Sequence, residues 1–186
     1  MTRTLLYTFA LLQMFALGAP CASAQQLITI KFSHVVAPNT PKGQAADKFK
    51  QLVEARSAGK IKVQVYPNSQ LFKDLDEIQA LQLNSVQIIA PSLSKFGPLG
   101  TRAFELFDLP FLFPDKSALY RVVDGEIGQR LFTQLESKGI KGLAYWDNGY
   151  KQMHMRKPVR KVEDLRGLKL RIQSSKLLEA QMRAVG

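Results

Sequence analysis

Along most of the chain, segments in which apolar and polar residues alternate at every step are followed by segments in which apolar residues recur at helical spacing. Residues 27–34 and 61–66 change between apolar and polar at nearly every step, which predicts two half-buried strands. The signal Thr40-Pro41 opens a helix with apolar residues at helical spacing, and a second helix is predicted over 74–83. The unbroken apolar run 86–90 is typical of a strand in a parallel sheet. This order predicts an α/β domain with a mainly parallel sheet.

The second half of the chain continues the alternation after one long interruption. Residues 91–114 are rich in Pro, Gly and Phe and predict an irregular connection, and connections of that length in a compact domain tend to be functional. Beyond them we expect two helices, two strands and a last helix, at 115–123 and 126–138, at 140–146 and 168–173, and at 175–184.

The first segment has the three parts of a secretory signal peptide. Arg3 gives a positive start, residues 5–17 form an apolar stretch too short to span a bilayer comfortably, and Ala22-Ser23-Ala24 is a small-x-small cleavage site. A proline before the single cysteine argues against a lipid anchor, and cleavage would remove that cysteine, so we expect no disulfide. We therefore expect residues 1–24 to be removed and the remainder to be soluble outside the inner membrane, without membrane insertion.

The net charge of +11 is concentrated near the C-terminal end. Residues 25–140 carry 14 Lys or Arg against 11 Asp or Glu, whereas residues 141–186 carry 11 against 4. The chain has no block of five basic residues and no basic stretch interleaved with stacking aromatics, so nucleic-acid binding is not supported. The basic last third favours an anionic small ligand, or a segment whose acidic partners lie in sequence that is absent here.

Side chains that leave the predicted strands are candidates for ligand contact, because ligands of open α/β sheets bind beyond the carboxyl ends of the strands. The polar residues at these exits are His34, Gln70, Asp74, Ser92, Lys95, Asn148 and Lys151. They include no nucleophile paired with a base, no glycine-rich phosphate loop and no cluster of histidines and carboxylates. We therefore expect no catalytic residue, no cofactor and no metal.

Arg171 is a further candidate for binding. In residues 168–173 the apolar side chains alternate with Lys169, Arg171 and Gln173, so a strand there would place the guanidinium on a polar face. A guanidinium is a rigid fork that can bind a carboxylate through two hydrogen bonds. An arginine on a solvated strand face is the plain alternative, and the spacing alone does not separate the two.

Six short motifs occur in a fixed order along the chain. They are Tyr66-Pro67-Asn68-Ser69-Gln70-Leu71, Ala80-Leu81-Gln82-Leu83, Ala90-Pro91-Ser92-Leu93-Ser94-Lys95-Phe96, Phe107-Asp108-Leu109-Pro110-Phe111, Tyr145-Trp146-Asp147-Asn148-Gly149 and Gly167-Leu168-Lys169-Leu170-Arg171. The set resembles the substrate-binding proteins of tripartite ATP-independent periplasmic (TRAP) transporters, and most closely the branch that binds four-carbon dicarboxylates. The resemblance extends from Leu27 to Gly186.

The resemblance implies an α/β, periplasmic binding protein-like fold of two domains. It places the first domain in residues 25–148 and the start of the second in residues 149–186. It also implies a monomer that closes on a dicarboxylate or a related organic acid and delivers it to the membrane permease subunits of a TRAP transporter.

For the site, the resemblance implies that Arg171 forms a two-pronged salt bridge with a ligand carboxylate and that Lys151 supports it. Ser92 and Lys95 match positions that face the ligand from the first domain, where Lys95 could meet a second carboxylate. The remaining candidates for ligand contact are His34, Asp74 and Asn148.

Members of that family continue well beyond the length of this chain. We therefore expect that the first domain lacks a later returning segment and that the second domain has only begun. The alternative function is an exported fragment of such a receptor that binds no ligand, and an unrecognised hydrolase is a more distant alternative.

Overall fold

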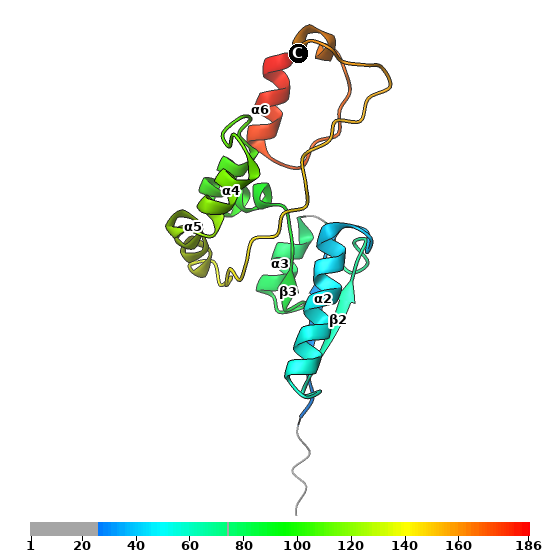
Figure 1. The fold of residues 1–186 in the computed structure, drawn as a ribbon, viewed down its shortest axis with the longest axis vertical. Coiled ribbons are helices and arrows are strands. Elements are labelled where there is room, and N and C mark those ends of the chain that lie inside the picture. Colours follow the sequence, from blue (N-terminus) through cyan, green and yellow to red (C-terminus); the bar gives the residue numbers. More distant parts are fainter. Residues whose placement is uncertain (1–25, 74) are drawn as a thin grey trace, which may run out of the picture.

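The computed structural model of the chain describes residues 26–73 and 75–186 (Figure 1). Its strands are β1 (Ile28–Ser33), β2 (Ile61–Tyr66) and β3 (Ile88–Ile89). Its α-helices are α2 (Pro41–Arg56), α3 (Asp76–Gln82), α4 (Lys116–Val123), α5 (Glu126–Glu136) and α6 (Lys176–Val185), and its 3₁₀ helices are η1 (Leu93–Leu99), η2 (Arg102–Asp108) and η3 (Val162–Leu165). The predicted signal peptide, residues 1–24, and the candidate Asp74 lie outside the described residues.

The strands form a parallel sheet in the order β2-β1-β3, with β1 in the centre. β1 pairs with β2 along its whole length, starting with Ile28 opposite Ile61, and only its end pairs with β3, starting with Phe32 opposite Ile88. The chain thus runs from the central strand to one edge and then crosses to the other edge. The predicted α/β class with a parallel sheet is confirmed.

Helix α2 packs on the sheet and begins where the sequence predicts. The Thr40 hydroxyl accepts a hydrogen bond from the Gly43 amide at 3.2 Å, and Pro41 occupies the first turn. A side-chain cap of this kind stabilises a helix by about 1 kcal/mol. Ala46 on the inner side of α2 is fully buried with Phe32 of β1, so sheet and helix share one core.

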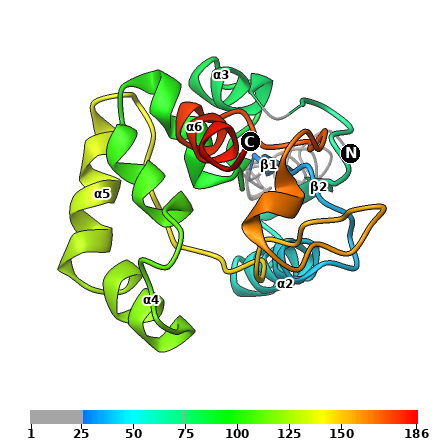
Figure 2. The same cartoon turned by 90° about the horizontal axis from the view of Figure 1, so that it is seen from above.

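A second core joins the elements that follow β2. Its buried residues are Ile78, Phe96, Phe104, Leu131, Leu135 and Ile140. They come from α3, from the two 3₁₀ helices η1 and η2, from α5 and from the segment after α5. Figure 2 shows α4 and α5 side by side and set apart from α2. The part of the chain that the structure describes therefore has two separate apolar clusters rather than one.

The connection at residues 91–114 is more ordered than predicted. We expected an irregular segment, but it contains η1 and η2, and this part of the prediction is wrong. The physical reason is burial, because Phe96 in η1 and Phe104 in η2 are 5% and 0% exposed and lie in the second core with their rings 5.2 Å apart. Aromatic anchors of this size order a segment whose Pro and Gly content disfavours a regular α-helix.

The two strands predicted at 140–146 and 168–173 are absent from the structure, and both predictions are wrong. Strand assignment needs a hydrogen-bonded neighbour, and among the described residues neither segment has one. The apolar side of the first segment packs on α5 instead, where the Tyr145 ring stacks on Phe132 at 4.2 Å and its hydroxyl donates to the Gly128 carbonyl at 2.9 Å. Alternation therefore predicted which side is apolar but not what covers it.

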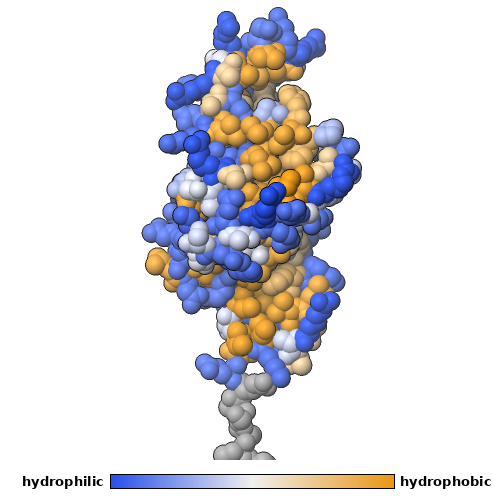
Figure 3. Space-filling view, turned by 90° about the vertical axis from the view of Figure 1, so that its left-hand side faces the viewer, coloured by the Kyte–Doolittle hydropathy of each residue, from blue (hydrophilic) through white to orange (hydrophobic). Residues whose placement is uncertain are grey.

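The last part of the chain is the least buried. The helix α6 begins at Ser175, whose hydroxyl accepts from the Leu178 amide at 3.3 Å, and Leu178 is its buried residue. Figure 3 shows apolar surface left open in the upper part of the molecule, the part that holds α6 in Figure 1. Val162 and Leu168 are exposed in this region. No helix within residues 26–73 and 75–186 is long and apolar enough to cross a membrane.

Candidate functional site

The carboxyl edge of the sheet is the first place to look for a site. The strand order reverses between β1 and β3, and in open α/β sheets ligands bind at the carboxyl ends of the strands where the order reverses. His34 directly follows β1, and Ala90, Pro91 and Ser92 follow β3. Sequence and topology therefore place two of the predicted ligand residues, His34 and Ser92, at this point.

His34 lies buried at the end of the central strand. Its side chain is 1% exposed, and its backbone amide donates to the Tyr66 carbonyl at 3.0 Å. Burial lowers the pKa of His34 from its ordinary value, and the positive charge of Lys42 lowers it further. A neutral imidazole can offer one donor and one acceptor to a ligand.

Four further polar side chains of the described residues are as deeply buried as His34. They are Ser33, Glu77, Ser94 and Lys95, each 0% or 1% exposed. The Ser33 hydroxyl donates to Glu77 Oε1 at 2.9 Å. Burying a charged group is costly unless other groups compensate it, so the burial of Glu77 and of the predicted ligand residue Lys95 is unusual for these residue types.

Lys42 links three segments at the same edge of the sheet. Its ammonium donates to the Ala90 carbonyl at 2.9 Å, directly after β3, and its backbone amide donates to Asn148 Oδ1 at 3.2 Å. The amide lies in the first turn of α2, where backbone N–H groups have no partner within the helix. The predicted ligand residue Asn148 is thus brought to α2 and to the exit of β3.

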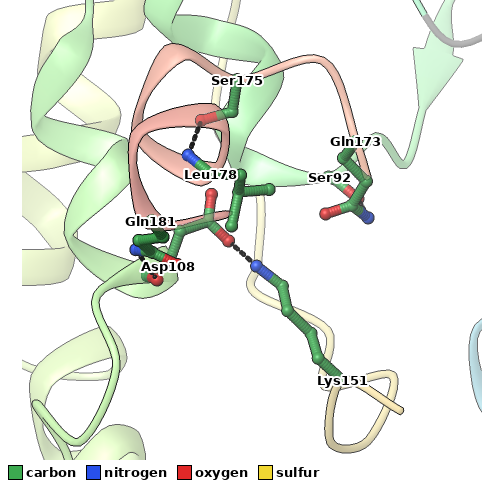
Figure 4. Close-up of polar contacts among 7 residues, drawn as sticks. All are labelled: Ser92, Asp108, Lys151, Gln173, Ser175, Leu178 and Gln181. Atoms are coloured by element: carbon green, nitrogen blue, oxygen red, sulfur yellow. Dashed lines mark hydrogen bonds and ion pairs between the residues drawn. The ribbon is translucent and has the colours of Figure 1, made fainter. Parts of the chain in front are cut away.

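Ser92 contacts the segment that carries Arg171. The Gln173 side-chain amide donates to the Ser92 hydroxyl at 2.7 Å (Figure 4). Leu168, Leu170 and Ile172 line a cavity of about 250 Å³ together with α6. The predicted two-sided character of residues 168–173 is therefore kept without strand pairing, with the apolar side toward α6. Arg171 belongs to the polar side by this alternation, and its side chain is exposed.

Lys151 forms an ion pair with Asp108 at the end of η2 (Figure 4). The lysine side chain is 55% exposed, whereas the aspartate side chain is 9% exposed. The Gln181 amide of α6 donates to the Asp108 backbone carbonyl at 2.9 Å. A lysine predicted to support a ligand carboxylate therefore already contacts a carboxylate of the chain.

The predicted site residues thus differ in how far they are exposed. Ser92, Asn148, Lys151 and Arg171 are partly or fully exposed, whereas His34 and Lys95 are buried. Asp74 cannot be placed, because it is outside the described residues. Among the residues that are described, no three His, Cys, Asp or Glu side chains gather as a metal site would require.

Sequence reasoning missed four polar residues of this region, Ser33, Lys42, Glu77 and Ser94. Lys42 and Glu77 lie in the first turns of predicted helices, where a charged side chain is normally solvated, so no pattern marked them as buried. Ser33 and Ser94 each neighbour a candidate, His34 and Lys95, and that adjacency was the available signal.

Comparison with known proteins gives a consistent result. Residues 32–186 match the family described as bacterial extracellular solute-binding protein, family 7 (DctP). The C4-dicarboxylate-binding periplasmic protein DctP of Rhodobacter capsulatus is 56% identical over 171 residues, which are 92% of this chain and 51% of that protein.

Two solved structures of TRAP periplasmic solute-binding proteins are also similar. The protein from Sulfurospirillum deleyianum, with bound succinate, has a TM-score of 0.82 and 50% identity and covers 86% of this chain and 51% of its own. The protein from Pseudomonas aeruginosa, with bound L-malate, has a TM-score of 0.81 and 50% identity and covers 86% of this chain and 55% of its own.

The chain spans about half the length of these relatives. The resemblance to TRAP substrate-binding proteins and the periplasmic binding protein-like fold class are confirmed, and the matching family is one of solute-binding proteins rather than enzymes. The division into domains at residues 25–148 and 149–186 stays a prediction. With a match that covers residues 32–186, the chain belongs to family 7 of the bacterial extracellular solute-binding proteins.

Proposed function

We propose that this protein is a periplasmic receptor for a four-carbon dicarboxylate or a related organic acid, and that it delivers the acid to the membrane permease of a TRAP transporter. The observation that carries the proposal is the hydrogen bond between Gln173 and Ser92. It brings the polar side of the Arg171 segment to the carboxyl edge of the parallel sheet, where ligands of such folds bind. Relatives of about 50% identity hold succinate and L-malate, which are acids of this class.

Arg171 is the proposed anchor for one ligand carboxylate. Its guanidinium offers two parallel N–H donors to a planar carboxylate, whereas a lysine offers a single point charge. Lys151 is the proposed support for the same end of the ligand. Its ammonium contacts Asp108 in this structure, so the incoming carboxylate would replace the aspartate as its partner or share the lysine with it.

The opposite end of the ligand is assigned to residues from the sheet edge. Ser92 offers a hydroxyl, and Lys95 offers the charge for a second carboxylate from its buried position. His34 would add a neutral donor or acceptor. Asn148 and Asp74 complete the proposed set, and Asn148 reaches it through its contact with α2.

The proposed context is that of an exported, monomeric receptor. Residues 1–24 would direct export, and the relatives are named periplasmic proteins. A receptor of this kind releases its ligand unchanged to the permease. It needs neither a cofactor nor a catalytic residue.

Calorimetric titration of the protein produced from its complete gene tests the proposal. Succinate, malate and fumarate are the ligands, and glycerol and putrescine serve as uncharged and cationic controls. We expect saturable binding of the acids alone and recovery of unchanged acid afterwards. Binding restricted to the controls would overturn the ligand class, and conversion of an acid to another compound would indicate an enzyme.

A further inference from the structure

Nearly every residue of the segment 145–151 contacts another part of the chain. Tyr145 stacks on α5, and the Trp146 ring lies 5.8 Å from the Phe32 ring of β1. Asn148 accepts from the first turn of α2, and Lys151 pairs with Asp108. Asp147 lies in the middle of this segment. We call residues 145–151 the crossover segment, because it joins the two predicted domains.

Asp147 uses both of its carboxylate oxygens. Its Oδ2 accepts from the Lys116 ammonium at 2.7 Å and from the Tyr120 hydroxyl at 2.9 Å, and its Oδ1 accepts from the Gly149 amide at 2.7 Å. Lys116 and Tyr120 are four residues apart on α4, so both donors lie on one face of that helix. One carboxylate therefore joins α4 to the crossover segment.

The contact with Gly149 is a local turn, and it explains why the chain needs glycine there. Gly149 has φ of +91°, a conformation that other residues rarely adopt, while a Cβ at this position would meet no atom within 4 Å. Glycine is therefore required at this position by the backbone conformation and not by a lack of space for a side chain. If Asp147 served only to close this turn, its Oδ1 would be sufficient. Its Oδ2 also accepts two hydrogen bonds from α4, so Asp147 has a second, non-local role.

The next residue extends the link to α4. The Lys116 ammonium lies 4.9 Å from the centre of the Tyr150 ring, a distance at which a cation and a ring face attract each other. Lys116 thus contacts two crossover residues, one before and one after Gly149. The Lys116 hydrogen bond also lowers the pKa of Asp147, so the carboxylate stays charged at neutral pH.

We propose that Asp147 is a positioning residue, which holds the crossover segment on α4 and thereby presents Asn148 and Lys151 to the ligand. This inference rests on the proposed function, since both residues are assigned there to ligand contact. Asp147 directly precedes Asn148 and lies four residues before Lys151. Loss of its carboxylate would release the crossover segment from α4 without removing any group assigned to the ligand.

Trp146 gives a direct measure of this effect, because it is the single tryptophan of the chain and adjoins Asp147. The test compares Asp147→Ala, Lys116→Met and Tyr120→Phe with the control Glu136→Gln, which breaks the exposed ion pair between Glu136 at the end of α5 and Lys141. We expect the three variants to increase quenching of Trp146 by acrylamide, with Tyr120→Phe giving the smallest increase. The control should quench like the unmodified protein. If all three variants quench like Glu136→Gln, the crossover segment is not held by Asp147 and the inference is wrong.

Succinate titration then separates positioning from a general loss of stability. We expect Asp147→Ala to weaken succinate binding by about tenfold, and by clearly less than tenfold when Lys151→Met is already present, because only the part that acts through Asn148 then remains. An equal loss in both backgrounds would assign Asp147 a purely structural role and overturn the inference. If the unmodified protein binds no acid, the proposed function fails, while the quenching comparison still decides whether Asp147 holds the segment. Should Asp147→Ala not fold, Tyr120→Phe decides the same point, because it removes one donor and keeps the ring.

Discussion

The part of the chain before residue 141 and the part after residue 148 differ in how their apolar side chains are covered. Of the 13 buried apolar residues found in the described ranges, 12 precede residue 141 and one, Leu178, follows residue 148. Both parts have the same kinds of sequence signal, namely capped helices and alternating runs. The difference teaches that such signals produce a packed structure only where a second element supplies the other side of the core.

The largest difference is expected for truncation of a core residue in each part. Phe104→Ala removes a fully buried ring from the second core and should lower the free energy of unfolding by about 3–5 kcal/mol. Leu178→Ala removes the buried residue of α6 and should cost no more than about 2 kcal/mol, because Leu178 belongs to neither of the two core clusters. Chemical denaturation of both variants measures the two costs. Equal costs would mean that the C-terminal part is packed as well as the first part.

The second comparison concerns two cations on one face of the C-terminal part. Arg171→Ala should weaken succinate binding by about 100-fold or more, because the ligand carboxylate then loses its charged partner in a closed site. Arg171→Lys should not restore binding, since lysine lacks the planar fork. Lys169→Ala, two residues earlier on the same side, is the matched control and should change affinity by less than about threefold. Calorimetric titration with succinate measures these affinities. A near-normal affinity of Arg171→Lys would contradict the proposed role of Arg171 as the carboxylate anchor.

The helix caps offer a matched pair of smaller effects. Thr40 and Ser175 each accept a hydrogen bond from an amide in the first turn, at 3.2 Å and 3.3 Å. Thr40→Ala should lower global stability by about 1 kcal/mol, because α2 is part of a packed core. Ser175→Ala should instead increase hydrogen exchange locally in α6 and leave the denaturation midpoint unchanged. A shift of the midpoint by Ser175→Ala equal to that of Thr40→Ala would contradict the difference between the two parts.

The smallest effect is expected from pH. The pKa of His34 lies below its ordinary value because of burial and Lys42, so the unfolded chain binds this proton before the folded chain does as pH falls. Stability is therefore highest above the ordinary pKa of 6.5 and decreases below it, until the folded-state pKa is reached. Denaturation at pH 7.5 and 5.5 should show this decrease, which His34→Gln should reduce. His154→Gln, at the other, exposed histidine, is the control and should retain it.

Most of the first part could be predicted from the sequence because its signals are local. The Thr40 cap, the alternation in residues 61–66 and the helices near 116–123 and 126–136 lie where the patterns indicate. The predicted strands at 140–146 and 168–173 failed for a non-local reason. Strand pairing requires another segment at the correct distance, and no periodicity within the strand itself reveals whether that segment is present.

The site was predictable to a different degree. Ser92 and His34 follow from the rule that ligands bind at strand ends, and Arg171 follows from the resemblance to a family. The ion pair of Lys151 with Asp108 and the burial of Glu77 did not follow from either, since they depend on how η2 and α3 fold back on distant segments. Whether these residues bind a ligand stays a prediction.

The position of β1 also has a consequence for the order in which the chain is made. β1 is the first element after the predicted signal peptide, yet it is the central strand, with Ile28 opposite Ile61 and Phe32 opposite Ile88. Because the chain is synthesised from its N-terminus, β1 cannot pair with its second neighbour, β3, until residue 89 has been added. Non-local pairing of this kind slows folding. Such a delay would leave the nascent chain unfolded for longer, which would favour export if residues 1–24 act as the predicted signal peptide.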